Sequence, residues 1–229
     1  MRSSLFGENV ETTAAQPMTL QNPRMLKVRL DNALTDVYAR QGTMVAYQGE
    51  VDFQFQGGGM GRFLKKMVTG EGLPLMKCTG RGDVFLAQDA QEIHLVDLDG
   101  DSITVNGRNV LAFEPGLDWD IRRVEGVSML AGGLFNTVFS GRGRLAIAAH
   151  GTPVVLSVDA PTYADLQSAI AWSSSLQTSV RRTARLGSLV GRGSGEAFQL
   201  SFTGYGVVVV QASEGPAVRA QDSGVGFGG

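Results

Sequence analysis

The sequence has few of the residues that build covalent links or transition-metal sites. Its single cysteine, Cys78, cannot form a disulfide within the chain. With only two histidines among 229 residues, the sequence does not favour a zinc site made of cysteine and histidine ligands. We therefore expect no resident metal and no cofactor.

Long hydrophobic runs and an excess of one charge are also missing. The first residues, MRSSLFGENV, lack the apolar segment of a secretory signal, and no segment approaches the roughly 18 consecutive apolar residues of a membrane span. The 20 basic and 22 acidic residues nearly balance, which argues against a protein held to nucleic acid by its overall charge. We expect a cytoplasmic protein, with peripheral contact to a membrane as an alternative.

Glycine, by contrast, is abundant. The chain has 31 glycines in 229 residues, close to twice the usual share of about 7%. Glycine permits the positive φ angles of tight turns and weakens helix interiors. Together with short β-branched runs such as residues 206–210 (GVVVV), this composition predicts an all-β protein with many turns.

Two short motifs recur three times in the same order. One is a tetrapeptide with two glycines between strand-like runs, at residues 79–82 (TGRG), 140–143 (SGRG) and 203–206 (TGYG). The other is an apolar run that ends in an aromatic residue, at residues 44–47 (MVAY), 110–113 (VLAF) and 169–172 (AIAW). The recurrence predicts three copies of one β unit of about 60 residues, at residues 26–90, 91–152 and 153–213.

The first glycine tetrapeptide contains Arg81-Gly82-Asp83, a tripeptide that resembles a cell-adhesion signal. At the equivalent position of the third copy Tyr205 replaces Arg81, so the tripeptide is not a shared feature of these corners. The flanking glycines predict a tight hairpin instead of a signal. One segment departs from the repeat, because the spacing of apolar residues after Pro161 predicts a short helical turn at residues 162–166.

Three equivalent units bury their apolar faces best by packing around a pseudo-threefold axis. We therefore expect a single compact β barrel or prism, with Tyr47, Phe113 and Trp172 in like environments and with no exposed strand edges. Residues 1–24 are expected to be an N-terminal extension, residues 25–213 the β domain, and residues 214–229 a flexible glycine-rich tail.

The chain resembles the AIM24 family in the order of several motifs between residues 25 and 213. These motifs are residues 59–67 (GMGRFLKKM), 69–73 (TGEGL), 79–82 (TGRG), 110–113 (VLAF), 132–135 (GGLF), 140–143 (SGRG) and 202–204 (FTG). The resemblance implies a TRAP-like β fold related to the double-stranded β-helix. Mitochondrial members are associated with mitochondrial biogenesis and inner-membrane organisation, so the resemblance implies a fold and a cellular context but no chemistry.

Acidic residues form two patterns that could carry chemistry. Asp97, Asp99 and Asp101 resemble the start of a calcium loop, but the twelfth position of that loop is Arg108 in place of the required glutamate. A hairpin turn with solvated carboxylates is the favoured interpretation, and a weak calcium site stays open. A second pair, at residues 118 and 120, alternates with Trp119 and is expected on the solvated face of a strand.

The segments between the second and third strands of each copy mix glycine with apolar and basic residues. Pseudo-threefold symmetry places these three connectors at one end of the molecule, where they could dock on a membrane surface or a protein partner. The alternative is that they plug the open end of the barrel. The candidate docking residues are Arg62, Phe63, Leu64, Lys65, Lys66, Met129, Leu130, Leu189 and Val190.

No catalytic arrangement stands out in the sequence. We therefore expect a non-catalytic binding or scaffold protein whose partner is another protein or a membrane surface, with homo-oligomers as a further option. Nucleic acid is not favoured as a partner. The alternative is a small-molecule or sugar-binding protein, or an enzyme, with an open polar cavity inside the barrel.

Overall fold

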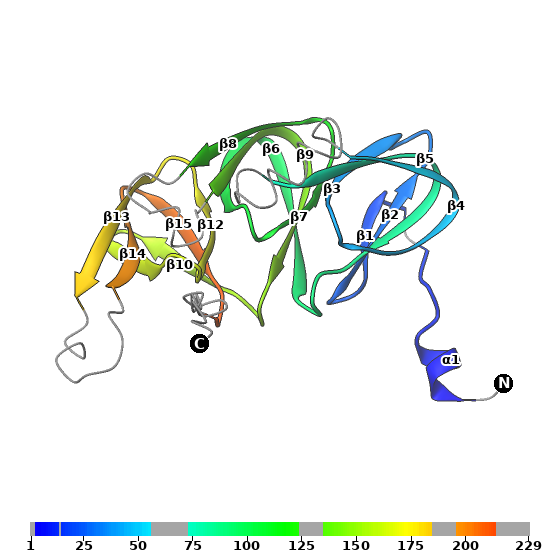
Figure 1. Ribbon diagram of the computed structural model, residues 1–229, viewed down its shortest axis with the longest axis horizontal. Helices are drawn as coiled ribbons and strands as arrows, with labels where there is room; N and C mark the ends of the chain where they lie inside the picture. Colours follow the sequence, from blue (N-terminus) through cyan, green and yellow to red (C-terminus); the bar gives the residue numbers. More distant parts are fainter. Residues whose placement is uncertain (1–2, 14, 56–72, 124–134, 185–195, 214–229) are drawn as a thin grey trace, which may run out of the picture.

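A computed structural model of the chain describes residues 3–13, 15–55, 73–123, 135–184 and 196–213. Most of this part of the chain is β-strand (Figure 1), which confirms the all-β prediction. The one helix among the described residues, α1 (Ser4–Glu8), is far too short to span a membrane.

The described residues contain fifteen strands. In chain order they are β1 (Met18–Asn22), β2 (Met25–Leu30), β3 (Asp36–Arg40), β4 (Met44–Phe55), β5 (Leu75–Leu86), β6 (Glu92–Asn106), β7 (Val110–Phe113), β8 (Leu117–Arg123), β9 (Phe135–Ala149), β10 (Val154–Val158), β11 (Thr162–Asp165), β12 (Ala169–Ser173), β13 (Gln177–Ala184), β14 (Glu196–Thr203) and β15 (Gly206–Val210). β1 lies within the predicted N-terminal extension, yet it pairs with β2 and its Met18 is fully buried.

Twelve strands form one antiparallel sheet, and β11, β14 and β13 form a second. The main path of the large sheet runs β1-β2-β5-β3-β7-β9-β6-β12-β15-β10, with β4 paired to β5 and β8 paired to β9. β1–β5 lie at one end of the molecule, β6–β9 in the middle and β10–β15 at the other end (Figure 1).

The prediction of a closed barrel is therefore wrong. Two ladders join these three groups of strands: β3 pairs with β7, and β6 pairs with β12. Among the described residues no third ladder returns from the last strands to the first, so the array stays open. Sequence repetition predicts equivalent contacts, but whether a row of equivalent units closes depends on the angle between them, which the sequence does not show.

The glycine corners do not reverse the chain, so the prediction of tight hairpins is also wrong. Gly80 and Gly82 lie in the middle of β5, with φ angles of +115° and +156°. β4 runs along one edge of β5 through this point, whereas the partner on the other edge changes from β3 to β2. β9 carries Gly141 and Gly143 in the same way, where its partner changes from β8 to β7. Glycine is needed because the strands cross closely: a Cβ on Gly80 would lie 2.3 Å from the Glu50 carbonyl oxygen.

The adhesion-like tripeptide is engaged within the fold. Asp83 forms an ion pair with Lys27 of β2, with 3.0 Å between Oδ2 and Nζ, and the Lys27 side chain is only 8% exposed. Arg81 donates a hydrogen bond to the Asn32 side chain. These contacts agree with the interpretation that Arg81-Gly82-Asp83 is structural.

The helical turn predicted at residues 162–166 is a strand instead. β11 pairs with β14 over four positions, with Thr162 opposite Phe202 and Ala164 opposite Leu200. The helix-like spacing of Tyr163, Leu166 and Ile170 does not mark one face, because Tyr163 is 46% exposed while Leu166 and Ile170 pack in different core clusters. Pairing with a distant strand outweighs the local pattern here.

The apolar side chains form three clusters along the row of strands. The first cluster joins β1–β5 to Leu111 and Ala146, and the second joins the middle strands to Leu75 and Ile170. The third lies among β10–β15. The first two clusters therefore each contain residues from more than one of these groups of strands.

Candidate functional site

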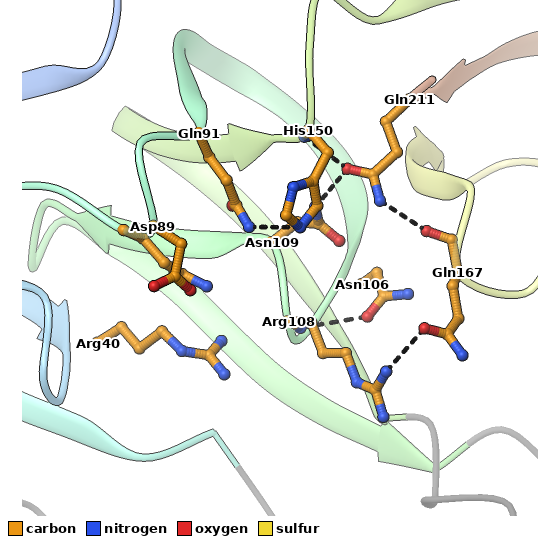
Figure 2. Close-up of a pocket in the computed structure, with 10 residues that line it drawn as sticks. Arg40, Asp89, Gln91, Asn106, Arg108, Asn109, His150, Gln167 and Gln211 are labelled. Atoms are coloured by element: carbon orange, nitrogen blue, oxygen red, sulfur yellow. Dashed lines mark hydrogen bonds between the residues drawn. The ribbon is translucent and has the colours of Figure 1, made fainter. Parts of the chain in front are cut away.

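A polar pocket lies at the ends of the strands, where turns from all parts of the chain meet. Its volume is about 300 Å³, and it is partly open to solvent. The lining side chains come from the turns after β3, β5, β6, β9, β11 and β15 (Figure 2). They are Arg40, Gln88, Asp89, Gln91, Asn106, Arg108, Asn109, His150, Gln167 and Gln211.

One side of the pocket is held by a chain of amide hydrogen bonds around Gln211. Its Oε1 accepts hydrogen bonds from the His150 backbone nitrogen at 2.9 Å and from the Asn109 side chain at 3.4 Å. Its Nε2 donates to the Gln167 carbonyl oxygen at 3.0 Å. Asn109 also donates to the Ala148 carbonyl oxygen at 2.7 Å. This network (Figure 2) joins the turns after β6, β9, β11 and β15 and makes that wall rigid.

The imidazole of His150 points toward Gln91 across the pocket (Figure 2), with 2.7 Å between its Nε2 and the Gln91 amide nitrogen. In this orientation the Gln91 amide nitrogen donates and the imidazole Nε2 accepts. The Gln91 Oε1 is buried and has no hydrogen-bond partner among the described residues. Asp89 adds a carboxylate nearby from a turn in which its φ angle is +46°, a conformation that Asp tolerates better than most residues.

Two guanidinium groups make the opposite wall electropositive. Arg40 donates to the Gly107 carbonyl oxygen at 2.8 Å, and Arg108 donates to the Gln167 Oε1 at 3.0 Å. Burial lowers the pKa of Arg40, and the neighbouring Arg108 lowers it further, whereas Asp89 opposes the shift. A lowered arginine pKa means that the surroundings stabilise the charge less well than water does. The pocket can therefore bind a small anion or a polyhydroxylated molecule through guanidinium and amide donors.

A second candidate site is the free edge of β4. The first residues of this strand, 44–47 (MVAY), match residues 110–113 of β7 and 169–172 of β12 in sequence. β7 and the matching part of β12 are buried. On β4, in contrast, Val45 is 53% exposed and Tyr47 is 51% exposed.

The predicted likeness of the three aromatic environments is therefore wrong. Phe113 is fully buried and Trp172 is 2% exposed, whereas the matching Tyr47 is half exposed. The reason is pairing, since β3 covers the outer edge of β7 and β6 covers that of β12. Among the described residues β4 pairs with β5 alone, so its outer edge is open. An exposed apolar strand edge is a surface on which another strand can pair.

The residues predicted to form a docking face lie outside the described part of the chain. This holds for all nine of them, from Arg62 to Val190. The connector face therefore stays a prediction from the sequence.

The three aspartates of the calcium-like pattern lie in a strand. β6 continues through them with a bulge between Asp99 and Ser102, so the hairpin expected here does not form. Arg144 holds Asp97, with 2.5 Å between its Nε and Oδ1, and this hydrogen bond lowers the pKa of the carboxyl. Arg142 holds Asp99 at 2.7 Å. The described residues contain no cluster of three potential metal ligands.

The other acidic pair also lies where the sequence placed it. Asp118 and Asp120 are exposed on β8, and Asp120 forms an ion pair with the exposed Arg122 at 3.2 Å. This is the solvated face of a strand.

Comparison with known proteins places the chain among relatives. The family model described as Mitochondrial biogenesis AIM24 matches residues 18–213. No curated protein is similar enough to match. Among solved structures the chain is similar to the crystal structure of protein SPYM3_0169 from Streptococcus pyogenes, with 22% identity and a TM-score of 0.68 over 86% of this chain and 92% of that one. At this identity the likeness shows the fold alone.

Proposed function

The chain belongs to the AIM24 family, and we propose that it is a non-catalytic binding protein that acts as a scaffold in a protein assembly. The observation that carries the proposal is the free edge of β4. Its residues 44–47 match segments that are buried in β7 and β12, yet Val45 and Tyr47 are about half exposed. A strand edge of this kind binds by adding a strand, in which backbone hydrogen bonds provide affinity and the apolar side chains provide specificity.

The proposal includes the three-unit organisation at residues 26–90, 91–152 and 153–213. Three long strands support it. β5 and β9 each keep one partner along one edge and change partners on the other edge near the glycines. The broken strand formed by β14 and β15 changes partners on both edges there. In such a row each unit covers the edge of the next. Within the described ranges, β4 in the first unit and β11 in the third each keep an edge without a strand partner, and such edges are where a scaffold would accept partners.

Co-purification from the protein's own host tests this function. Tyr47→Lys places a charge on the β4 edge, and Trp119→Lys places one on an exposed aromatic residue of β8 as the matched control. The proposal expects one or more proteins to be recovered with the unchanged chain and with Trp119→Lys, but not with Tyr47→Lys. The same recovery with all three chains would sink the proposal.

A second candidate function is the binding of a small polar ligand in the pocket. It is favoured by one observation, the pair of guanidinium groups of Arg40 and Arg108 in a cavity of about 300 Å³. Arg40 is half-buried and Arg108 is exposed, and Asp89 is the one carboxylate in the lining, so an anionic ligand would add counter-charge to the two guanidinium groups. The two functions are compatible, because the pocket and the β4 edge use different residues.

A further inference from the structure

We propose that the free edge of β11 pairs with the free edge of β4 in a second copy of the chain, so that chains join head to tail. This inference rests on the proposed scaffold function and names the partner. Within the described residues β11 pairs only with β14, and β4 pairs only with β5. Each of these strands thus has one edge of backbone donors and acceptors without strand partners.

The ladder between β3 and β7 shows how strand edges of this kind pair within the chain. In this antiparallel ladder Tyr38 lies opposite Phe113, and Ala39 lies opposite Ala112. The rings of Tyr38 and Phe113 stack with centroids 5.3 Å apart and planes 26° apart. The contact leaves Ala39, Ala112 and Phe113 fully buried.

The junction between β6 and β12 has the same register. Thr104 lies opposite Trp172, and Val105 lies opposite Ala171. In both junctions the aromatic residue that ends the apolar motif faces one strand position, and the alanine before it faces the next. Two independent ladders in one chain therefore use the same geometry.

β11 occupies the same position in the third unit that β3 occupies in the first unit and that the second half of β6 occupies in the second unit. Tyr38 lies opposite the residue three places before Gly80, and Thr104 lies opposite the residue three places before Gly141. Tyr163 in β11 lies opposite the residue three places before Gly204. β3 pairs through its other edge with β7, and β6 pairs through its other edge with β12. On β11 the equivalent edge has no strand partner among the described residues.

The shared register predicts the contact between two copies. Tyr163 of one chain lies opposite Tyr47 of the next, and Ala164 lies opposite Ala46. Tyr163 is 46% exposed and Tyr47 is 51% exposed, so stacking of these rings would bury two large apolar surfaces. A tyrosine already stacks on an aromatic ring at the equivalent pair of Tyr38 and Phe113.

The partner is a second copy because the two edges are far apart in one chain. β4 lies at one end of the row, and β14, to which β11 is paired, lies at the other end (Figure 1). One copy carries both halves of the contact, so each new copy leaves the same two edges open. Such a contact is heterologous and generates a ring if the rotation closes, or a filament if it does not.

Crosslinking between two single-cysteine variants tests the register. Gln48→Cys and Thr162→Cys, which the same register places opposite each other as Ser173 lies opposite Ile103, are prepared as separate full-length chains, mixed, and treated with a short bismaleimide. In the single chain Gln48 is exposed and Thr162 is half-buried, so both thiols are accessible. Directly opposite residues of an antiparallel pair have Cβ atoms about 4.5–5.5 Å apart, well within the reach of this reagent. Cys78 does not compete, because it is buried and burial raises the pKa of its thiol to about 12.

The mixture is expected to give a covalent species of twice the chain mass of 24.3 kDa. Each variant alone is the matched control and is expected to stay at the mass of one chain, because a head-to-tail contact never brings like residues together. Dimers from Gln48→Cys alone would show edge-to-edge pairing of two β4 strands and overturn the inference. It is also overturned if the mixture gives no dimer.

The two proposals fail separately. If the mixture gives no dimer but Tyr47→Lys still loses host proteins, the scaffold function stands with a different partner on the β4 edge. If the mixture crosslinks and no host protein depends on Tyr47, the edge serves self-assembly alone.

Discussion

Tyr38 of β3 stacks on Phe113 of β7, with ring centroids 5.3 Å apart. This contact covers an edge that would otherwise be open, and it explains why Phe113 is fully buried while Tyr47, which ends the same sequence motif, is half exposed. Nearly identical sequence segments thus have different environments because of their neighbours. The difference leaves Val45 and Tyr47 exposed along the β4 edge.

The equivalent positions Leu111 and Val45 are predicted to respond differently to truncation. Leu111→Ala removes a fully buried side chain between two core clusters and is expected to lower the free energy of unfolding by about 3 kcal/mol. Val45→Ala removes a side chain that is 53% exposed and is expected to cost less than about 1 kcal/mol in dilute protein. Urea denaturation at low protein concentration measures both. Equal losses would mean that Val45 is buried in the single chain.

The composition predicted the all-β class correctly, because abundant glycine with short β-branched runs is typical of strands and turns. What the sequence could not show is where a strand ends. Residues 79–82 have the composition of a hairpin, yet they lie inside β5, since the chain there crosses other strands without turning back. Hydrogen bonding to strands far away in sequence decides between these outcomes.

Gly80 is predicted to be far less replaceable than Gly100, although both have positive φ angles. A Cβ on Gly80 would lie 2.3 Å from the Glu50 carbonyl oxygen, whereas Gly100 (φ +88°) has nothing within 4 Å. Gly80→Ala combines backbone strain with a steric clash and is expected to cost more than about 3 kcal/mol. Gly100→Ala meets strain alone and is expected to cost about 1 kcal/mol. Thermal denaturation of the two variants checks the order, and similar losses would contradict the close crossing of β4 and β5.

Asp83 is predicted to stabilise the protein through Lys27. Removing its charge leaves a lysine side chain that is 8% exposed with Glu11 as its remaining acidic partner. Asp83→Asn is expected to lower the free energy of unfolding by about 2 kcal/mol. Asp52→Asn, on the exposed side of β4, is the control and is expected to change it by less than about 0.5 kcal/mol. An effect of Asp83→Asn no larger than the control would mean that the ion pair is not stabilising.

The same lysine predicts a loss of stability in alkali. Burial lowers the pKa of Lys27, but its hydrogen bonds to Glu11 and Asp83 outweigh this effect and leave the pKa raised. The contribution of the charged lysine is therefore complete below the ordinary lysine pKa of about 10.4 and is lost as the pH rises through the raised value. Urea titrations on either side of that pH should show a steeper loss for the unchanged protein than for Lys27→Met. Parallel losses would assign the alkaline transition to other groups.

The pocket is predicted to bind small anions through its arginines. Glucuronate and inorganic phosphate serve as probes. Binding of a probe raises the free energy of unfolding by mass action, by about 2.7 kcal/mol at a hundredfold excess over its dissociation constant. The expected readout is a higher melting temperature. Arg40→Gln is expected to abolish the shift. Arg122→Gln, at an exposed ion pair on β8, should retain it. No shift with either probe, or equal shifts in all three proteins, would argue against an anion site at Arg40.

The sequence contained no signal for this pocket. Its lining comes from six turns, and most of the side chains are amides, which carry no recognisable motif. Gln91, Asn109 and Gln211 are separated by long stretches of sequence and meet only because the turns after their strands share one end of the sheet. The β4 edge was equally hidden, since the sequence alone presents residues 44–47 as one more buried motif.

Sedimentation of the purified protein tests the central claim most directly. The unchanged chain and Val45→Lys are compared over a range of concentrations, with Trp119→Lys as the control for a charge on an exposed apolar position elsewhere. The account predicts that the unchanged chain and Trp119→Lys form species larger than the 24.3 kDa chain, and that Val45→Lys sediments as a single chain. Sedimentation of the unchanged protein as a single chain at every concentration would contradict head-to-tail pairing of β11 with β4.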